Sequence, residues 1–317
     1  MTRSRARRRI LLAGLLCLLS VLVSGCSFAD LPTWGWPMGI TPEAVRMREF
    51  WQGATIAALA VGVVVWGLMF WAFIVYHKRK NGPLYPKQTK ENLPLELVYT
   101  AVPFLMVFVL FYFTVTTENV TLAKVPDPDV TVDVTAFKWN WDFGYPGTTV
   151  PGTGGEVHTV GTSDEIPLLV LPVNKVIQYN LRSKDVVHSF WTIDFLMKRD
   201  VFPYPEQNQT DNKFQNTIEQ TGAFVGRCAE LCGTYHSAMN FEVRAVPQDV
   251  YDAYLGLRQK LNPQTGAPYT AAQALTAVGK AIPSCGELCA PLATTTAPMN
   301  TDRTAKGADE PVPPGGS

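Results

Sequence analysis

Two long apolar stretches without a charged side chain constrain this sequence more than any other feature. They run from Phe50 to Tyr76 and from Leu97 to Thr117. A bilayer core of about 30 Å is crossed by roughly 20 apolar residues in a helix, so each stretch is long enough to span a membrane. We therefore predict spans at about 52–76 and 96–117, which form a transmembrane hairpin within residues 26–118.

The first 25 residues have the composition of a secretory signal. Several arginines precede a short apolar core, and the segment ends in VSGC. This ending resembles the lipobox of bacterial lipoproteins, in which the cysteine is lipidated and becomes the mature N-terminus. We expect residues 1–25 to be a lipoprotein-type signal peptide and Cys26 to carry the lipid. The alternative is an uncleaved anchor helix.

The loop between the two apolar stretches is basic and reads HKRKNGPLYPKQTK. Because Lys-rich and Arg-rich loops stay in the cytoplasm, both mature ends and everything after Glu118 should lie outside. The chain is thus expected to be a multi-pass protein of the cell membrane, in contact with membrane lipid. The outer part has more acidic than basic residues, which favours a basic protein partner and not nucleic acid.

Residues 119–250 change character and predict an all-β antiparallel sandwich or barrel. Short runs rich in Val, Ile, Leu and aromatic residues alternate with clusters of Gly, Pro, Asn and Asp. These runs are 130–137, 165–173 and 175–182. Residues 251–317 are expected to be a C-terminal extension: helical spacing predicts short helices at 249–261 and 271–281, and the polar tail from Thr301 is expected to be disordered.

The segment from Cys228 to Met239, CAELCGTYHSAM, combines thiol, imidazole and thioether groups. Together they are soft to borderline donors, which suit copper. Two cysteines allow both sulfurs to bridge two copper ions, and each ion then needs one histidine and one weaker ligand. His188, His236, Met239 and the backbone carbonyl of Glu230 would supply these. The remaining histidines are expected elsewhere, His77 at the cytoplasmic end of the first span and His158 in a glycine-rich loop.

Three other interpretations of this segment explain fewer residues. A disulfide between Cys228 and Cys232 leaves His236 and Met239 without a role. A structural zinc site leaves Met239 unexplained, since zinc rarely takes a thioether. A mononuclear copper site needs only one cysteine.

Over residues 40–250 the sequence resembles subunit II of the haem–copper cytochrome c oxidase family. The resemblance rests on the two apolar stretches, DVVHSF, CAELCGTYHSAMNFEVR and FKWNWDFGYP; LVLPVNK and FVGRCAELCGTYH look like the actinobacterial branch. It implies a cupredoxin-like sandwich that holds the dinuclear copper centre called CuA. The ligands it implies are His188, Cys228, Glu230 through its carbonyl, Cys232, His236 and Met239.

The resemblance also implies a function and partners. Subunit II accepts electrons from cytochrome c and passes them to haem in subunit I, where oxygen is reduced to water with proton pumping. The partners would be subunit I, other oxidase subunits and a cytochrome c, soluble or membrane-bound within a cytochrome bc complex. The chain has no C-x-x-C-H motif, so no haem of its own is expected.

Further roles follow from the same resemblance. The carboxylate of Glu230 would bind magnesium or manganese at the interface with subunit I. Trp139, the first Trp of KWNW, would be the residue through which electrons enter; from the residues alone a buried core Trp is the alternative, and Trp141 is expected in the core. Asp185 stands in a D-x-x-H arrangement and would hold the ring of His188 in orientation.

Glu96 begins an E-x-x-Y-T-x-x-P motif at the cytoplasmic start of the second span. In the family a Glu at this point lies near the entrance of a proton pathway in subunit I. The alternative is an ordinary acidic residue stabilised by the helix dipole.

The sequence departs from the family pattern in two places. CGELC at 285–289 copies the cysteine spacing without a following His or Met, so we expect a disulfide between Cys285 and Cys289. Lys198 and Asp200 match a K-x-D pattern, and Asp200 is expected to support the metal site, but the P-G-R turn that usually follows is missing.

Other functions account for fewer features. Subunit II of quinol oxidases lacks the copper ligands, and nitrous oxide reductase has a second large domain that this chain lacks. The principal alternative is a membrane-tethered copper carrier or metallochaperone, but its metal site would usually be exposed.

Overall fold

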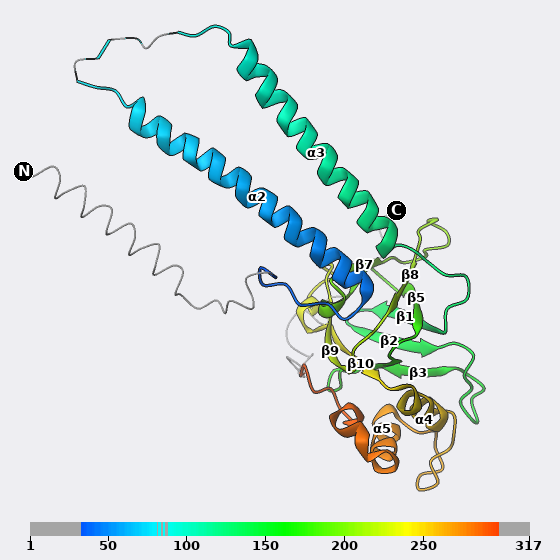
Figure 1. Cartoon of the computed structure of the whole chain (residues 1–317). Helices are drawn as coiled ribbons and strands as arrows, with labels where there is room; N and C mark the ends of the chain where they lie inside the picture. The colour runs from blue at the N-terminus through cyan, green and yellow to red at the C-terminus, as the bar shows by residue number, and fades with distance from the viewer. Residues whose placement is uncertain (1–32, 81, 84, 86–87, 298–317) are drawn as a thin grey trace, which may run out of the picture. The chain divides into compact units, whose positions relative to one another are not determined.

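The computed structural model describes residues 33–80, 82–83, 85 and 88–297 (Figure 1). The predicted signal peptide, Cys26 and the predicted disordered tail from Thr301 lie outside the described residues. The chain divides into two compact units, Met1–Pro37 and Met38–Ser317. Only residues 33–37 of the first unit are described, and they form a turn in which Trp36 N donates to Thr33 O at 3.0 Å.

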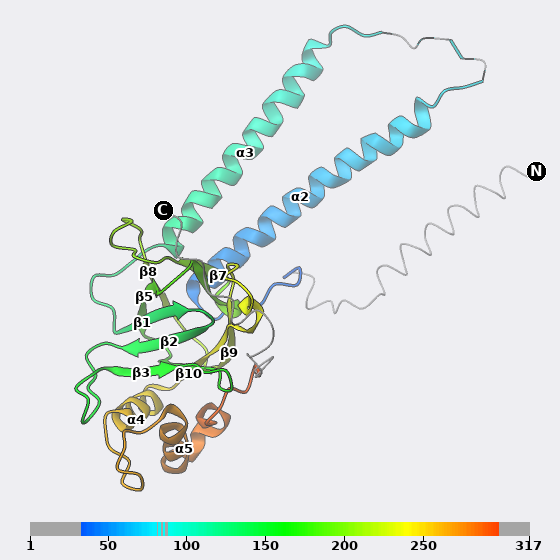
Figure 2. The same cartoon turned by 180° about the vertical axis from the view of Figure 1, so that it is seen from behind.

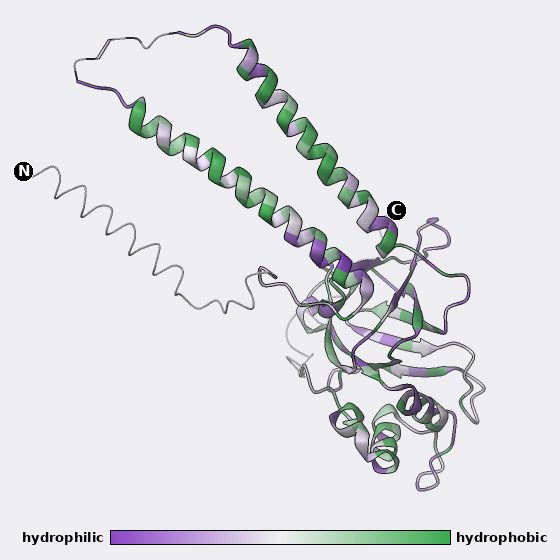
Figure 3. Ribbon diagram, viewed as in Figure 1, coloured by the Kyte–Doolittle hydropathy of each residue, from purple (hydrophilic) through white to green (hydrophobic). Residues whose placement is uncertain are grey.

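Two long helices, α2 (Pro42–Val75) and α3 (Leu93–Thr121), lie side by side (Figures 1 and 2). Each begins at a capping side chain: Thr41 Oγ1 accepts from Ala44 N, and Asn92 Oδ1 accepts from Leu95 N. Most of their residues are hydrophobic (green in Figure 3), and both helices are candidate membrane spans, with mean hydropathy 2.4 and 2.1. A helix of 34 residues is roughly 50 Å long, so α2 extends past the hydrocarbon core of a bilayer.

Within the described residues, ten strands form two five-stranded sheets that pack face to face (Figures 1 and 2). The first sheet has the order β3 (Val157–Val160), β2 (Asn140–Tyr145), β1 (Val130–Phe137), β5 (Val176–Ser183), β8 (Lys213–Thr217). The second has the order β4 (Leu168–Pro172), β10 (Asn240–Val246), β9 (Gly222–Cys228), β6 (His188–Thr192), β7 (Met197–Val201). The β1–β5 and β4–β10 pairs are parallel, so the predicted purely antiparallel arrangement is wrong.

An aromatic cluster fills the space between the sheets. Trp141 and Phe143 from β2 contact Phe241 from β10, with ring centroids 5.2 and 5.5 Å apart. Phe241 in turn stacks on Phe190 of β6 at 4.7 Å. These side chains are buried because β-strands alternate their side chains between core and solvent, as Val132, Val134 and Ala136 do along β1.

Short helices complete the fold. The 3₁₀ turns η1 (Ile193–Phe195) and η2 (His236–Ala238) lie between strands, and α4 (Gln248–Arg258), α5 (Ala271–Ala281) and η3 (Pro283–Cys289) follow β10. Helix α4 ends at Arg258, earlier than predicted, whereas α5 has the predicted bounds. The predicted fold class, a two-helix hairpin, a cupredoxin-like sandwich and short C-terminal helices, is confirmed.

A buried ion pair attaches the C-terminal segment to β10. Arg244 is bonded to Glu242, and both side chains are fully buried. The guanidinium also donates to the carbonyls of Leu288, Ala290 and Leu292, while Glu242 accepts from the backbone and hydroxyls of Thr294 and Thr295. We call this contact between β10 and residues 287–295 the C-terminal clasp.

One histidine lies elsewhere than expected. His158 belongs to β3, where its Nδ1 lies 2.8 Å from Asp142 Oδ1 of the neighbouring strand. The loop prediction for this residue is wrong because the turn residues end before it and the strand begins at Val157.

Candidate metal centre

Strand pairing brings the two ends of the predicted metal site together. His188 begins β6 and Cys228 ends β9, and these strands are neighbours in the second sheet, with Phe190 opposite Cys228. The loop that follows Cys228 is closed at its base, since Cys228 N donates to Met239 O and Ala229 N donates to Ser189 O, both at 3.0 Å.

The donor atoms of all six predicted ligand positions converge. Cys228 Sγ lies 3.9 Å from Cys232 Sγ, 3.8 Å from His188 Nδ1 and 3.3 Å from Glu230 O. Cys232 Sγ lies 3.6 Å from His236 Nδ1 and 3.9 Å from Met239 Sδ. Each sulfur thus has one imidazole and one weaker donor beside it.

This geometry fits a pair of copper ions. The thiols of Cys228 and Cys232 are free and buried, and their separation is far from the roughly 2 Å of a disulfide bond. His188, Cys228 and Cys232 offer ligand atoms that lie within 4.8 Å of one another. Two central sulfurs with histidine and thioether at the sides make a soft donor set, which copper prefers and which hard cations do not.

A hydrogen bond couples the two thiols. The hydrogen bond with Cys232 lowers the pKa of Cys228 to about 3, and the same contact, with burial, raises the pKa of the Cys232 thiol well above its usual range. The macroscopic titration belongs to the pair. Binding of a metal to both sulfurs would release the proton of this hydrogen bond.

Asp185 fixes the ring of His188. Its Oδ1 accepts from His188 Nε2 at 2.8 Å, which leaves Nδ1 directed at Cys228. Its Oδ2 accepts from Lys138 N at 2.7 Å. Burial raises the pKa of Asp185, but the bonds from His188 and from the backbone outweigh it and lower the pKa below its usual value. The carboxylate therefore links the metal site to the strand turn that carries Trp139.

Both tryptophans of the KWNW segment contact the loop from Cys228 to Met239, which we call the metal loop. Trp139 Nε1 donates to Cys232 O at 3.1 Å, and Trp141 Nε1 donates to Met239 O at 3.3 Å. Trp141 is fully buried, as expected. The bond from Trp141 to the loop was not predicted, because the indole N–H of a core Trp can reach many carbonyls and the sequence does not say which.

The structure also places two acidic residues predicted near the centre. The carboxylate of Glu230 is partly exposed, and Lys198 Nζ lies 3.9 Å from its Oε2. Lys198 also donates to Asp200 Oδ1 at 2.9 Å. Asp200 thus contacts the same lysine as Glu230. In the β6–β7 register Asp200 also lies opposite Ser189, the residue after His188.

Two further predicted sites lie away from the metal loop. Glu96 is in the first turn of α3, where its Oε1 accepts from Asn92 N at 3.0 Å. Cys285 and Cys289 are joined in a disulfide within η3, with Cα atoms 5.6 Å apart.

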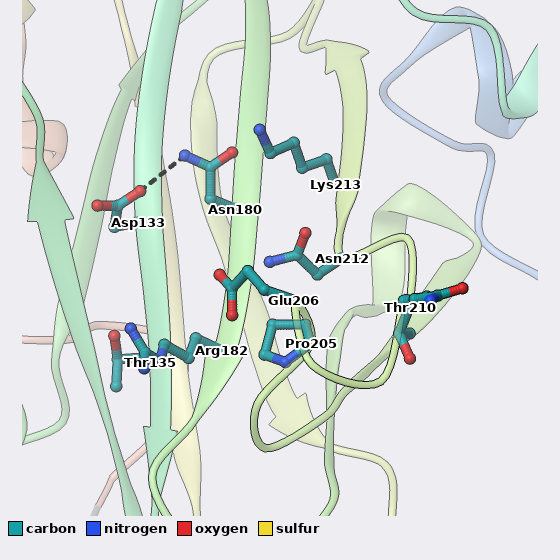
Figure 4. Close-up of a pocket in the computed structure, with 10 residues that line it drawn as sticks. Asp133, Thr135, Asn180, Arg182, Pro205, Glu206, Thr210, Asn212 and Lys213 are labelled. Carbon is teal, nitrogen blue, oxygen red and sulfur yellow. Dashed lines mark hydrogen bonds between the residues drawn. The ribbon is translucent and has the colours of Figure 1, made fainter.

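One hollow among the described residues is not lined by the metal centre. It has a volume of about 550 Å³ and lies over the outer face of β1, β5 and β8 (Figure 4). Its lining is polar and of mixed charge, with Asp133, Arg182, Glu206 and Lys213, and its lining residues include neither cysteine nor histidine. The donor set, not cavity size, marks the functional site.

Comparison with known proteins agrees with this donor set. Residues 153–246 match the family model of the cytochrome c oxidase subunit II periplasmic domain. The chain is 46% identical to the probable cytochrome c oxidase subunit 2 of Nocardia farcinica, with 98% of this chain and 92% of the relative covered. It is 43% identical to cytochrome c oxidase subunit 2 of Mycobacterium tuberculosis, with 95% and 91% covered.

Among solved structures, the chain is similar to the periplasmic domain of subunit II of cytochrome oxidase from Bradyrhizobium japonicum. The identity is 28% and the TM-score 0.35, with 42% of this chain and 95% of that chain covered. The two curated relatives match nearly the full length of the sequence. It follows that this membrane protein, with its two candidate spans and its histidine, cysteine and methionine cluster, belongs to the cytochrome c oxidase subunit 2 family.

Proposed function

We propose that this chain accepts electrons from cytochrome c and passes them to haem in subunit I of an oxidase that reduces oxygen to water and pumps protons. The observation that carries the proposal is the convergence of two free, buried thiols, two imidazoles, a thioether and a carbonyl, supplied by His188 of β6 and by the segment from Cys228 to Met239. No other cluster among the described residues has this donor set.

The residues that would hold two copper ions are His188, Cys228, Glu230 through its carbonyl, Cys232, His236 and Met239. When bound, the ions would supply a one-electron carrier whose unpaired electron is shared across both thiolate sulfurs. The protein's contribution is rigidity. His188 is held by Asp185, the loop is closed by Cys228 N and Met239 O, and the burial of the sulfurs excludes water.

Electrons would enter through Trp139. This side chain is half-buried, and its indole N–H donates to the carbonyl of Cys232, one of the two central residues. The contact gives a direct path from the surface to the site without an intervening solvent gap.

Glu230 supports a second metal site. Its carbonyl faces Cys228 while its carboxylate is partly exposed next to Lys198. A carboxylate oxygen is a ligand that magnesium and manganese accept, and a partly exposed carboxylate can be completed by ligands from subunit I. Asp200, which shares Lys198 with Glu230, would support this position.

The remaining proposals concern the membrane part and the partners. The basic loop between α2 and α3 favours a cytoplasmic position, which puts the copper domain on the outer side of the cell membrane. Glu96 would then lie near the cytoplasmic entrance of a proton pathway in subunit I, and Cys26 would carry a lipid anchor. The electron donor would be a cytochrome c, soluble or held in a cytochrome bc complex.

A copper-delivery role fits this site less well. A carrier must release its metal, which requires exposed and movable ligands. Here His188 is 0% and Met239 is 1% exposed, the two cysteines are buried, and only His236 among the side-chain donors is half-buried. Buried donors on a loop closed at its base favour retention of the metal.

Copper EPR of the purified, assembled oxidase tests the proposal. We expect the hyperfine pattern of one unpaired electron shared equally by two copper nuclei, and its loss in the Cys228→Ser variant. The matched control is Cys285→Ser, which removes a cysteine of similar burial outside the loop and should leave the pattern intact. A pattern from a single copper nucleus in the unaltered protein would contradict the proposal.

A further inference from the structure

The indole of Trp139 is held on more than one side by the metal loop. Its N–H donates to Cys232 O at 3.1 Å. The ring of Tyr235 meets it edge-on, with centroids 5.1 Å apart and an interplanar angle of 77°. Gly233 lies against the indole so closely that a Cβ there would be 3.2 Å from Cζ2 and Nε1.

Tyr235 is itself fixed by the loop. It lies in the chain between Cys232 and His236 and is only 9% exposed. Its carbonyl accepts from Ala238 N at 3.0 Å, and His236 N donates to Gly233 O at 3.1 Å. The position of the Tyr235 ring is therefore set by the same short turns that set the donor atoms.

The contact between Trp139 and Tyr235 lies at the edge of a hollow beside the indole. A hollow of about 270 Å³ is lined by Trp139 and Tyr235 together with Phe137 and residues 161–163. Without the Tyr235 ring, the indole would have room to turn into this hollow and away from Cys232 O. An edge-to-face aromatic pair is a specific geometry that restricts such rotation.

We infer that Tyr235 is a positioning residue for electron acceptance: its ring keeps the Trp139 indole in contact with the Cys232 carbonyl. The inference rests on the proposed function, in which electrons enter through Trp139. In each transfer the ferrous haem of the donor loses one electron and becomes ferric, and the copper pair gains that electron. No bond forms or breaks at Trp139 or Tyr235.

The test compares Tyr235→Leu with Tyr235→Phe in the assembled oxidase, using reduced cytochrome c as donor. Tyr235→Leu should lower kcat by roughly 10-fold to 100-fold, the scale of a displacement of about 1 Å at a reacting group. KM should stay the same because Tyr235 lies beneath the surface, and the copper EPR should not change. Tyr235→Phe keeps the ring and should restore the rate. Tyr204→Leu, which alters an exposed tyrosine of the same domain, is the matched control.

Each outcome decides the inference. A Tyr235→Leu enzyme with normal kcat would overturn it, as would a changed copper EPR, which would make Tyr235 a support of the metal loop. A Phe variant as slow as the Leu variant would assign the effect to the hydroxyl and also overturn it.

A double-variant cycle separates this inference from the proposed function. If Tyr235 acts through Trp139, Tyr235→Leu should have no further effect in a Trp139→Phe background. If Trp139→Phe is slow but Tyr235→Leu is not, only the inference fails. If Trp139→Phe has normal kcat, the assignment of Trp139 as the point where electrons enter fails.

Discussion

Asp185 joins two parts of the copper site that lie far apart in the sequence. One oxygen accepts from His188 and the other from the backbone of Lys138, beside Trp139. The family resemblance implied the first contact, through the D-x-x-H arrangement of Asp185 and His188. The second contact could not be predicted, because it depends on how close the β1–β2 turn comes to the β5–β6 loop. The same is true of the Trp139 bond to Cys232 O.

Replacing Asp185 by Asn tests the importance of the carboxylate. Asn has one acceptor oxygen in place of two, so His188 Nε2 or Lys138 N loses its partner. We expect copper affinity to fall by about 10-fold to 100-fold, as for other residues that orient a ligand histidine. Competition with a chelator measures the copper affinity of each variant. Asp164→Asn, in an exposed loop, should bind copper normally, and equal affinity in both variants would refute the role of Asp185.

At the scale of elements, the C-terminal clasp is a contact that local sequence patterns do not predict. The β-rich composition of VTVDVTAF predicted β1, and the helical spacing of 271–281 predicted α5, because these signals are local. The burial of Glu242 and Arg244 was unexpected, since charged residues in a strand normally face water. Only residues 287–295, more than 40 positions away, provide the carbonyls and threonines that make this burial tolerable.

Arg244→Met should destabilise the protein through the charge it leaves behind. Glu242 would remain buried without its cation, which costs about 3–5 kcal/mol when one partner of such a pair is removed. Thermal unfolding of the full chain in detergent measures the loss. Arg227→Met, which changes an exposed arginine on the adjacent strand β9, should have little effect. A similar loss in both variants would mean that the clasp contributes nothing specific.

The clasp also predicts a dependence of stability on pH. Burial raises the pKa of Glu242, but the bonds from Thr295 and the charge of Arg244 lower it below its ordinary value. A depressed pKa contributes stability that is complete above the unfolded value of about 4.3 and is lost as pH falls through the folded value.

Thermal unfolding of Glu242→Gln and of the unaltered chain, compared from pH 7 downward, measures this contribution. The variant's deficit should stay constant above about pH 5 and shrink below about pH 4. A deficit that does not change with pH would show that Glu242 acts through its shape and not its charge.

For the whole molecule, the copper site draws its ligands from separate parts of the second sheet. His188 comes from β6, Cys228 from β9, and the other donors from the loop before β10. The sequence indicated the donor segment from Cys228 to Met239 and the two candidate spans because both signals are local and chemically specific. It did not give the strand order, since parallel pairs such as β4–β10 join segments about 70 residues apart.

Copper should therefore stabilise the folded chain as a unit. A ligand that binds only the folded state adds about 2.7 kcal/mol at 100 times its dissociation constant. We expect the unfolding temperature of the full-length protein to rise on addition of copper and to fall after chelation. The Cys228→Ser variant should show a much smaller shift. An equal shift in the variant would indicate that copper binds elsewhere.

The C-terminal clasp has a consequence for the order in which the chain is made. Glu242 emerges from the ribosome 52 residues before Thr294. At about 5–20 residues per second, this interval lasts several seconds. Until residues 287–295 emerge, Glu242 and Arg244 have each other but none of the carbonyls and threonines that later enclose them. The copper loop and β10 can thus be complete in the nascent chain while the outer face of β10 is still uncovered, and a chain that stops before Thr294 lacks the groups that bind Glu242.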